Sequence, residues 1–151
     1  MKTTSTYSGS LFNTSGALHV GSNGDNLGSL EFNGYLDDLR VTKGTAIYTE
    51  NFAVPTAAVG PTGTPITTSG GFEDQSRNHG VVKNGDVRLS TSVKKFGTSS
   101  AYFDGTGDYL SLTQGYRIAP GDFSYEDDDF TIEAWVYLTS YNSQGSMIIS
   151  R

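Results

Sequence analysis

The stretch from Phe32 to Gly44, FNGYLDDLRVTKG, spaces its apolar residues in a way that a regular strand cannot accommodate. Leu36, Leu39 and Val41 cannot all lie on one side of such a strand, because successive side chains alternate between its two faces. One extra residue at the pair Asp37-Asp38 restores the alternation. We therefore predict a bent strand with a β-bulge at this acidic pair, which re-aims both carboxylates.

The rest of the chain also favours an all-β fold. Its 151 residues include 19 glycines, nine tyrosines and eight phenylalanines, and short strand-like runs alternate with Gly/Asn/Asp turns. Such sequences are typical of sandwiches or barrels, and the length allows a real core. The run 130–138 alternates cleanly. One face would carry Phe130, Ile132, Ala134 and Val136, and the other Thr131, Glu133, Trp135 and Tyr137. Because both faces of a sandwich strand can be partly covered, we expect Trp135 in the core.

Charge and composition exclude several function classes. The net charge of −6 argues against nucleic acid as a partner and permits cation binding. No run approaches the ~18 apolar residues of a membrane span, and the first residues, MKTTSTYSGSLFN, lack the apolar run of a signal peptide. The chain has no cysteine, so it can neither form disulfides nor use thiol chemistry. A soluble chain is expected, and a virion protein would have the same features.

A linker divides the chain by composition. Residues 53–71, AVPTAAVGPTGTPITTSGG, hold three of the four prolines and almost no charge. With the boundary near Ala58, the predicted organisation is 1–57, a linker at 58–71, and 72–151.

Two groups of residues carry a family resemblance. The sequence GYLDDLRVTKG, followed by AIYTENF, resembles the closing strand of laminin G-like, concanavalin A-like domains. The resemblance is to copies of this domain found in bacteriophage and marine viral structural proteins. The runs 95–112, KFGTSSAYFDGTGDYLSL, and 130–137, FTIEAWVY, resemble the strands that open such domains. The resemblance implies an antiparallel jelly-roll β-sandwich, permuted or incomplete. Residues 1–57 would be its C-terminal half and 72–151 its N-terminal half.

The inverted order of these halves has three explanations, which stay open at this point. The chain is a window from a tandem array in a longer fibre or adhesin, or it is a permuted domain with fewer strands. Joining the old termini is sterically cheap where the first and last strands are neighbours. In the third explanation the halves complement each other between molecules, which would build rings or filaments.

The acidic pair in the bulge is a candidate calcium site. Calcium takes six to eight oxygen ligands, and Asp37 and Asp38 offer carboxylates at a bent strand. The resemblance implies a structural calcium ion where the first and last strands meet, which adds Asp74. In the alternative, one acid caps the bulge and pairs with Arg40 while the other is solvated.

Two turn-forming stretches have the Asn/Asp/Gly chemistry of sugar sites. These are the loop 21–29, with Asn23, Asp25 and Asn26, and the turn from Asp104 to Asp108. In a sugar site, the amides and carboxylates would bind paired hydroxyls of the ligand, and Tyr109 or Tyr35 would stack on the sugar ring. The alternative is simple turn formation.

An enzymatic function lacks a motif. Polysaccharide-cleaving jelly rolls carry E-x-D-x-x-E on one strand, a pattern missing here, and a chain without cysteine and with only His19 and His79 gives no support for a triad. We therefore expect a non-catalytic recognition module. It would be a lectin-like, carbohydrate-binding display domain of a viral particle, tail fibre or adhesin, located on the virion or cell surface. The alternative is a structural virion or filament protein that contacts neighbouring copies, and an oligomer is possible in either case.

Overall fold

The computed structural model describes residues 17–22, 30–57, 71–72, 79–114, 129–141 and 145–150. Its strands are β1 (Leu18–Val20), β2 (Asn33–Lys43), β3 (His79–Asn84), β4 (Arg88–Ser90), β5 (Ser100–Asp104), β6 (Tyr109–Gln114), β7 (Phe130–Leu138) and β8 (Ile149–Ser150). The described residues contain no α-helix, and hence no helix that could cross a membrane.

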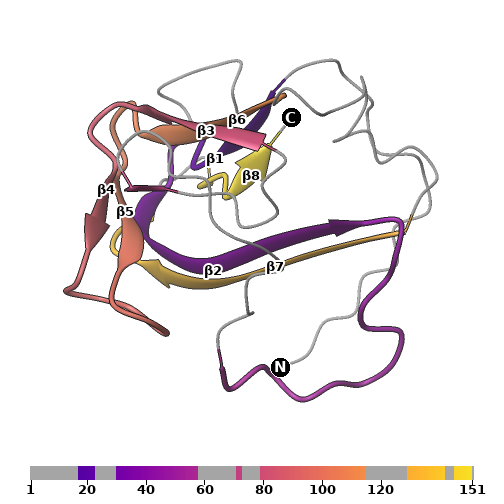
Figure 1. The fold of residues 1–151 in the computed structure, drawn as a ribbon. Coiled ribbons are helices and arrows are strands. Elements are labelled where there is room, and N and C mark those ends of the chain that lie inside the picture. Colours follow the sequence, from indigo (N-terminus) through magenta and orange to yellow (C-terminus); the bar gives the residue numbers. More distant parts are fainter. Residues whose placement is uncertain are drawn as a thin grey trace.

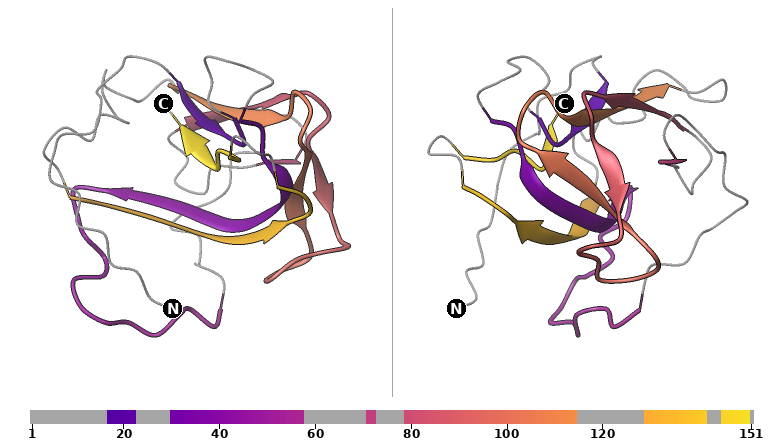
Figure 2. Two further views of the ribbon diagram at one scale, coloured as in Figure 1. Left: turned by 180° about the vertical axis from the view of Figure 1, so that it is seen from behind. Right: turned by 90° about the vertical axis from the view of Figure 1, so that its left-hand side faces the viewer.

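These strands form two antiparallel four-stranded sheets, in the orders β3-β6-β1-β8 and β4-β5-β2-β7. The long strands β2 and β7 lie in one layer, and β1, β3, β6 and β8 lie in the layer across from it (Figure 1). The same two layers are seen from behind in Figure 2. The prediction of an all-β sandwich is confirmed.

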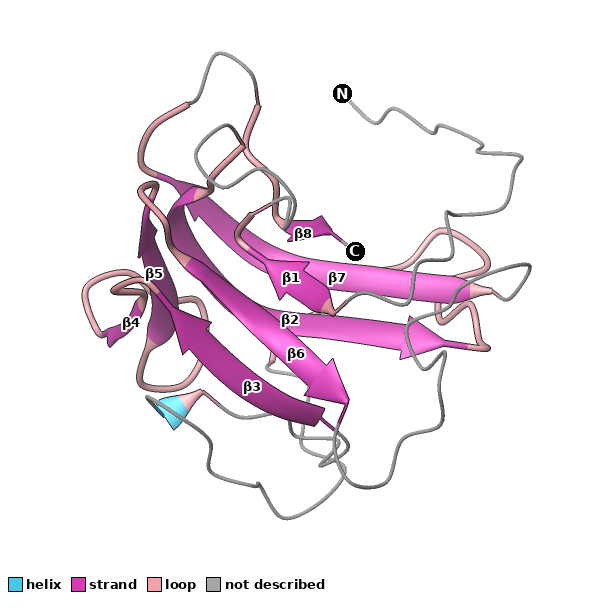
Figure 3. Cartoon of the chain, turned by 90° about the horizontal axis from the view of Figure 1, so that it is seen from above, coloured by secondary structure: helices cyan, strands magenta, loops and turns pink. Residues whose placement is uncertain are grey.

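The segments on either side of the linker share both sheets. β1 lies between β6 and β8 (Figure 3), and β2 lies between β5 and β7. In register, Val20 pairs with Leu110 and Ile149, and Leu36 pairs with Ala101 and Val136. Within this chain the two segments therefore build one sandwich. Their assignment to halves of a laminin G-like domain stays a prediction, and most of the predicted linker, 58–70, lies outside the described residues.

The predicted β-bulge is present in β2. Asp37 pairs with Trp135 and Arg40 with Glu133, so two residues of β2 lie opposite the single residue between them on β7. Asp38, at the bulge, has a positive φ of 52°. The bulge allows Leu36, which is 5% exposed, and Leu39, which packs against the core, to face the same side.

The core lies between the two sheets and is built from both segments. Its largest fully buried side chains are Phe32 and Phe103, whose rings meet edge to face at 5.6 Å. Burying such a side chain contributes about 1.5–3 kcal/mol. The core cluster consists of Val20, Phe32, Leu36, Phe72, Val81, Val87, Phe103 and Leu110.

The predicted alternation of β7 is confirmed, although its core-side face is incompletely covered. Ile132 pairs with Val41 and Val136 pairs with the buried Leu36, so these residues share the core-side face. Both remain partly exposed, at 40% and 41%. The opposing strands are short, since β1 has three residues and β8 two, whereas β7 has nine.

Candidate functional site

The outer face of the sheet β4-β5-β2-β7 carries one cation and three tyrosines in a row across all four strands. Arg88 pairs with Tyr102, Tyr102 with Tyr35, and Tyr35 with Tyr137. Side chains of directly paired residues lie on the same face of a sheet. Tyr35 precedes the buried Leu36, so this row points away from the core. We call Tyr102, Tyr35 and Tyr137 the tyrosine row.

The rings of the tyrosine row contact one another and remain open to solvent. The ring centres of Tyr35 and Tyr102 are 4.8 Å apart, and those of Tyr35 and Tyr137 are 6.0 Å apart. Tyr137 is 56% exposed. The guanidinium carbon of Arg88 lies 4.4 Å from the centre of the Tyr102 ring, a cation–π distance. The row is thus a continuous aromatic strip with a cation at one end.

Trp135 also lies on this outer face, and the expectation of a core tryptophan is wrong. The alternation of β7 places Trp135 opposite the core-side residues Ile132 and Val136. A loop between β4 and β5 covers it instead, with the Phe96 ring edge-on at 5.9 Å and the Lys95 ammonium 4.2 Å from its ring centre. Trp135 is therefore half-buried beside the tyrosine row.

Asp37 fixes this loop to the sheet. Its Oδ2 accepts the backbone N–H of Lys95 at 2.7 Å and that of Phe96 at 2.9 Å. At the end of the loop, the Ser100 hydroxyl donates to the Val93 carbonyl. Sequence reasoning missed this role, because a contact between residues 58 positions apart leaves no local pattern.

The loop and the tyrosine row enclose an open groove of about 200 Å³. Its lining includes three aromatic residues, one acid and two lysines. Its lining residues are Tyr35, Asp37, Val93, Lys94, Lys95, Ser100, Trp135, Val136 and Tyr137. This combination can stack a flat or ring-shaped ligand and also donate and accept hydrogen bonds.

The residues of the predicted calcium site are only partly described. Asp37 has one oxygen engaged by two amides, Asp38 occupies the bulge, and Asp74 lies outside the described residues. Arg40, considered above as a partner of the bulge acids, forms an ion pair with Glu133 across the strands. The calcium site stays a prediction.

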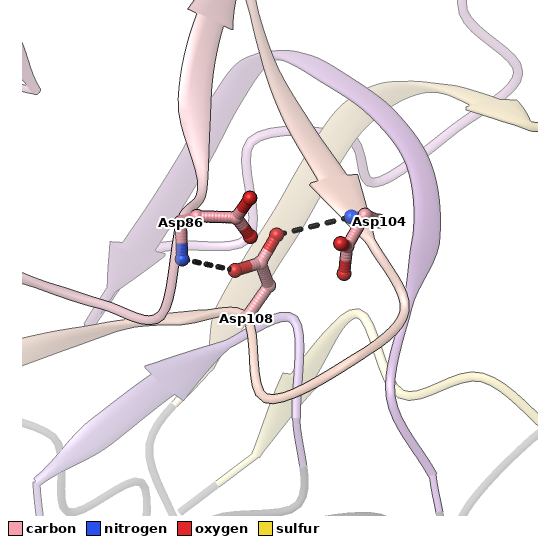
Figure 4. Close-up of side chains that lie close together, drawn as sticks. All are labelled: Asp86, Asp104 and Asp108. Carbon is pink, nitrogen blue, oxygen red and sulfur yellow. Dashed lines mark hydrogen bonds between the residues drawn. The ribbon is translucent and has the colours of Figure 1, made fainter.

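The turn from Asp104 to Asp108 is held together by the carboxylate of Asp108 (Figure 4). This side chain is fully buried, and its two oxygens accept the backbone N–H groups of Asp86 at 2.7 Å and Asp104 at 3.0 Å. Burial raises the pKa of Asp108, against the opposing effect of these two hydrogen bonds. The chain crosses from one sheet to the other between β3 and β4 and again between β5 and β6. The Asp108 carboxylate connects these two crossings.

Of the other predicted sugar-binding residues, the structure describes Asp104 and Tyr109. Asp104 lies near Asp108, and with Asp86 the three carboxylates have ligand atoms within 4.8 Å of one another, close enough to hold a metal ion. Tyr109 lies on the other sheet, with its ring 5.5 Å from that of His19. Asn23, Asp25 and Asn26 lie outside the described residues. The geometry gives Asp108 a structural part, and ligand binding by this set stays a prediction.

No protein-family model, no curated protein and no solved structure matches the chain. The resemblance to laminin G-like domains therefore remains a prediction, and a function has to be argued from the geometry of the outer face.

Proposed function

We propose that this chain is a non-catalytic carbohydrate-binding module whose binding surface is the tyrosine row together with the adjoining groove. The single observation that carries the proposal is the registered row of Tyr102, Tyr35 and Tyr137 on three neighbouring strands, ending beside Trp135 and the groove. The proposal keeps the lectin-like function expected from the sequence and moves its site from the rim loops to the sheet face.

The chemistry of the face suits sugars. A pyranose ring has an apolar face that stacks on aromatic rings and a rim of hydroxyls that need donors and acceptors. At about 200 Å³, the groove is smaller than the roughly 300–1,000 Å³ of pockets that enclose drug-sized ligands. It would hold about one ring, with the remaining rings of an oligosaccharide lying along the tyrosine row.

The wider setting of this module is part of the same proposal. The resemblance of 32–44, 95–112 and 130–137 to laminin G-like sequences supports a jelly-roll connection of the strands, in permuted order. The same resemblance supports display on a virion, tail fibre or adhesin outside the cell, and a structural calcium ion at the closing strand as predicted above.

Tryptophan fluorescence provides the test, because Trp135 is the only tryptophan and lines the groove. We expect hits on a glycan array and, for those glycans, a saturable change in Trp135 emission. Tyr137→Ala should weaken binding about tenfold or more, the effect of truncating an aromatic hot spot. Tyr141→Ala is the matched control, because Tyr141 is 78% exposed and outside the row. Equal affinities for the two variants, or no glycan bound, would refute the proposal.

Assembly through strand edges is the second candidate function, and β7 favours it. Among the strands that the structure describes, β7 lies at an edge of its sheet, and it has nine residues. Its core-side residues Phe130, Ile132, Val136 and Leu138 are 40–47% exposed. Exposed apolar edge strands add strands from other chains. This candidate predicts concentration-dependent oligomers in light scattering that Ile132→Lys abolishes, with no response to glycans.

A further inference from the structure

We infer that the groove selects acidic sugars, those that carry a carboxylate on the ring, over neutral ones; this inference rests on the proposed function. The chain as a whole has a net charge of −6, yet the groove is lined by two lysines and a single acid. A local excess of positive charge on an acidic protein needs an explanation, and a ligand of opposite charge supplies one.

The two lysines are available to a ligand. Within the described part of the chain, neither Lys94 nor Lys95 forms an ion pair. The Lys94 ammonium donates to the Thr91 carbonyl at 2.9 Å, which leaves two of its three donors. The Lys95 ammonium lies 4.2 Å from the centre of the Trp135 ring, directly beside the surface on which a sugar would stack.

The acid in the groove cancels only part of this charge. Asp37 Oδ2 accepts two backbone N–H groups, so the loop amides satisfy much of its demand for positive partners. Asp37 forms no ion pair with either of these two lysines. A carboxylate on the ligand would therefore meet two ammonium groups and one carboxylate, a net positive charge.

A further cation, Arg88, lies at the far end of the tyrosine row. Arg88 lies over Tyr102, and its nearest acid, Asp86, is 3.9 Å away, with both side chains more than half exposed. Such a pair contributes little. Three strand spacings separate β4 from β7, about 14 Å in all. An oligosaccharide of repeated acidic sugars would thus meet cations at both ends of the row, which a single acidic monosaccharide could not.

The experiment compares oligogalacturonate and oligomannuronate with their methyl esters, which keep the rings and remove the charge. Binding is followed by Trp135 fluorescence and calorimetry at low and high salt. We expect the acids to bind about fivefold to tenfold more tightly than the esters, and the ratio to fall as salt screens the charges. Lys94→Gln combined with Lys95→Gln should lower the ratio of acid affinity to ester affinity toward one. Lys83→Gln, which removes one positive charge on the other sheet, is the control for each single lysine variant.

The outcomes separate this inference from the proposed function. Neutral glycans or esters that bind as tightly as the acids would overturn the inference and leave the carbohydrate module standing. A preference for acids that is as large in the double lysine variant as in the wild type would also overturn it. Binding of neither acids nor any neutral glycan would overturn the proposed function itself. Binding of polyphosphate as strong as that of the acids would show a general anion site and reject sugar selectivity.

Discussion

The carboxylate of Asp37 accepts the backbone N–H of Lys95 at 2.7 Å, and this contact joins the bulge in β2 to the wall of the groove. Without the extra residue at the bulge, Leu36 and Leu39 could not both face the core-side layer. The bulge thus serves the core through its leucines and the outer face through Asp37, which lies opposite Trp135. One local irregularity connects the packing of the sandwich to its candidate site.

Removing the Asp37 carboxylate should loosen the loop without unfolding the sandwich. Asp37→Ala leaves the Lys95 and Phe96 amides without their acceptor, at a cost of about 1–2 kcal/mol because the partly exposed amides regain water. Trp135 emission should shift to the red as the loop leaves its ring, and glycan affinity should fall. Asp37→Asn, which keeps one acceptor oxygen, should show a smaller shift. Identical spectra for wild type and Asp37→Ala would contradict this role.

The sequence predicts the local features of the fold better than its long-range contacts. The bulge and the two faces of β7 follow from side-chain alternation alone, and both are found. Alternation cannot tell which loop covers a face, and the prediction of a core Trp135 is wrong for this reason. The sequence predicts a Gly/Asp turn before Asp108, but it does not indicate that the chain there crosses between sheets and buries the acid. The Asp37 contact spans 58 residues and leaves no periodic signal.

Asp108 should make a stability contribution that decreases as pH rises. Burial raises its pKa above the ordinary 3.8, so between that value and the higher native pKa the folded state binds more protons than the unfolded state. The difference in unfolding free energy between the wild type and Asp108→Asn should be largest below about pH 3.8. It should decrease as the pH rises through this window and then stay constant. Urea unfolding of both proteins from pH 3 to 7 measures it. A difference that grows with pH would show that the two N–H bonds outweigh burial.

If calcium binds at the closing strand, β2, it should raise the melting temperature, and this rise should depend on Asp38. A ligand at 100 times its Kd that binds only the folded state stabilises by about 2.7 kcal/mol, or roughly 5–10 °C for a chain of this size. Scanning calorimetry in calcium and in chelator should show this rise for the wild type and not for Asp38→Asn. Asp86→Asn is the control, because it alters the separate cluster with Asp104 and Asp108. Superimposable melting curves in calcium and chelator would reject the calcium prediction.

Two glycines with nearly the same backbone angle should respond very differently to alanine. Gly85 has a φ of +70° and Gly107 a φ of +72°. An added Cβ at Gly85 would lie 2.4 Å from Asp108 Oδ1 and 2.6 Å from the Gly107 carbonyl, whereas at Gly107 it would meet nothing within 4 Å. Both variants carry the backbone penalty of roughly 1–2 kcal/mol for a left-handed alanine. Only Gly85→Ala must also displace the buried carboxylate, which should add about 1–3 kcal/mol by breaking its bond to Asp86. Urea unfolding with an unchanged slope would measure the difference, and equal losses in the two variants would mean that Asp108 does not hold the two crossings together.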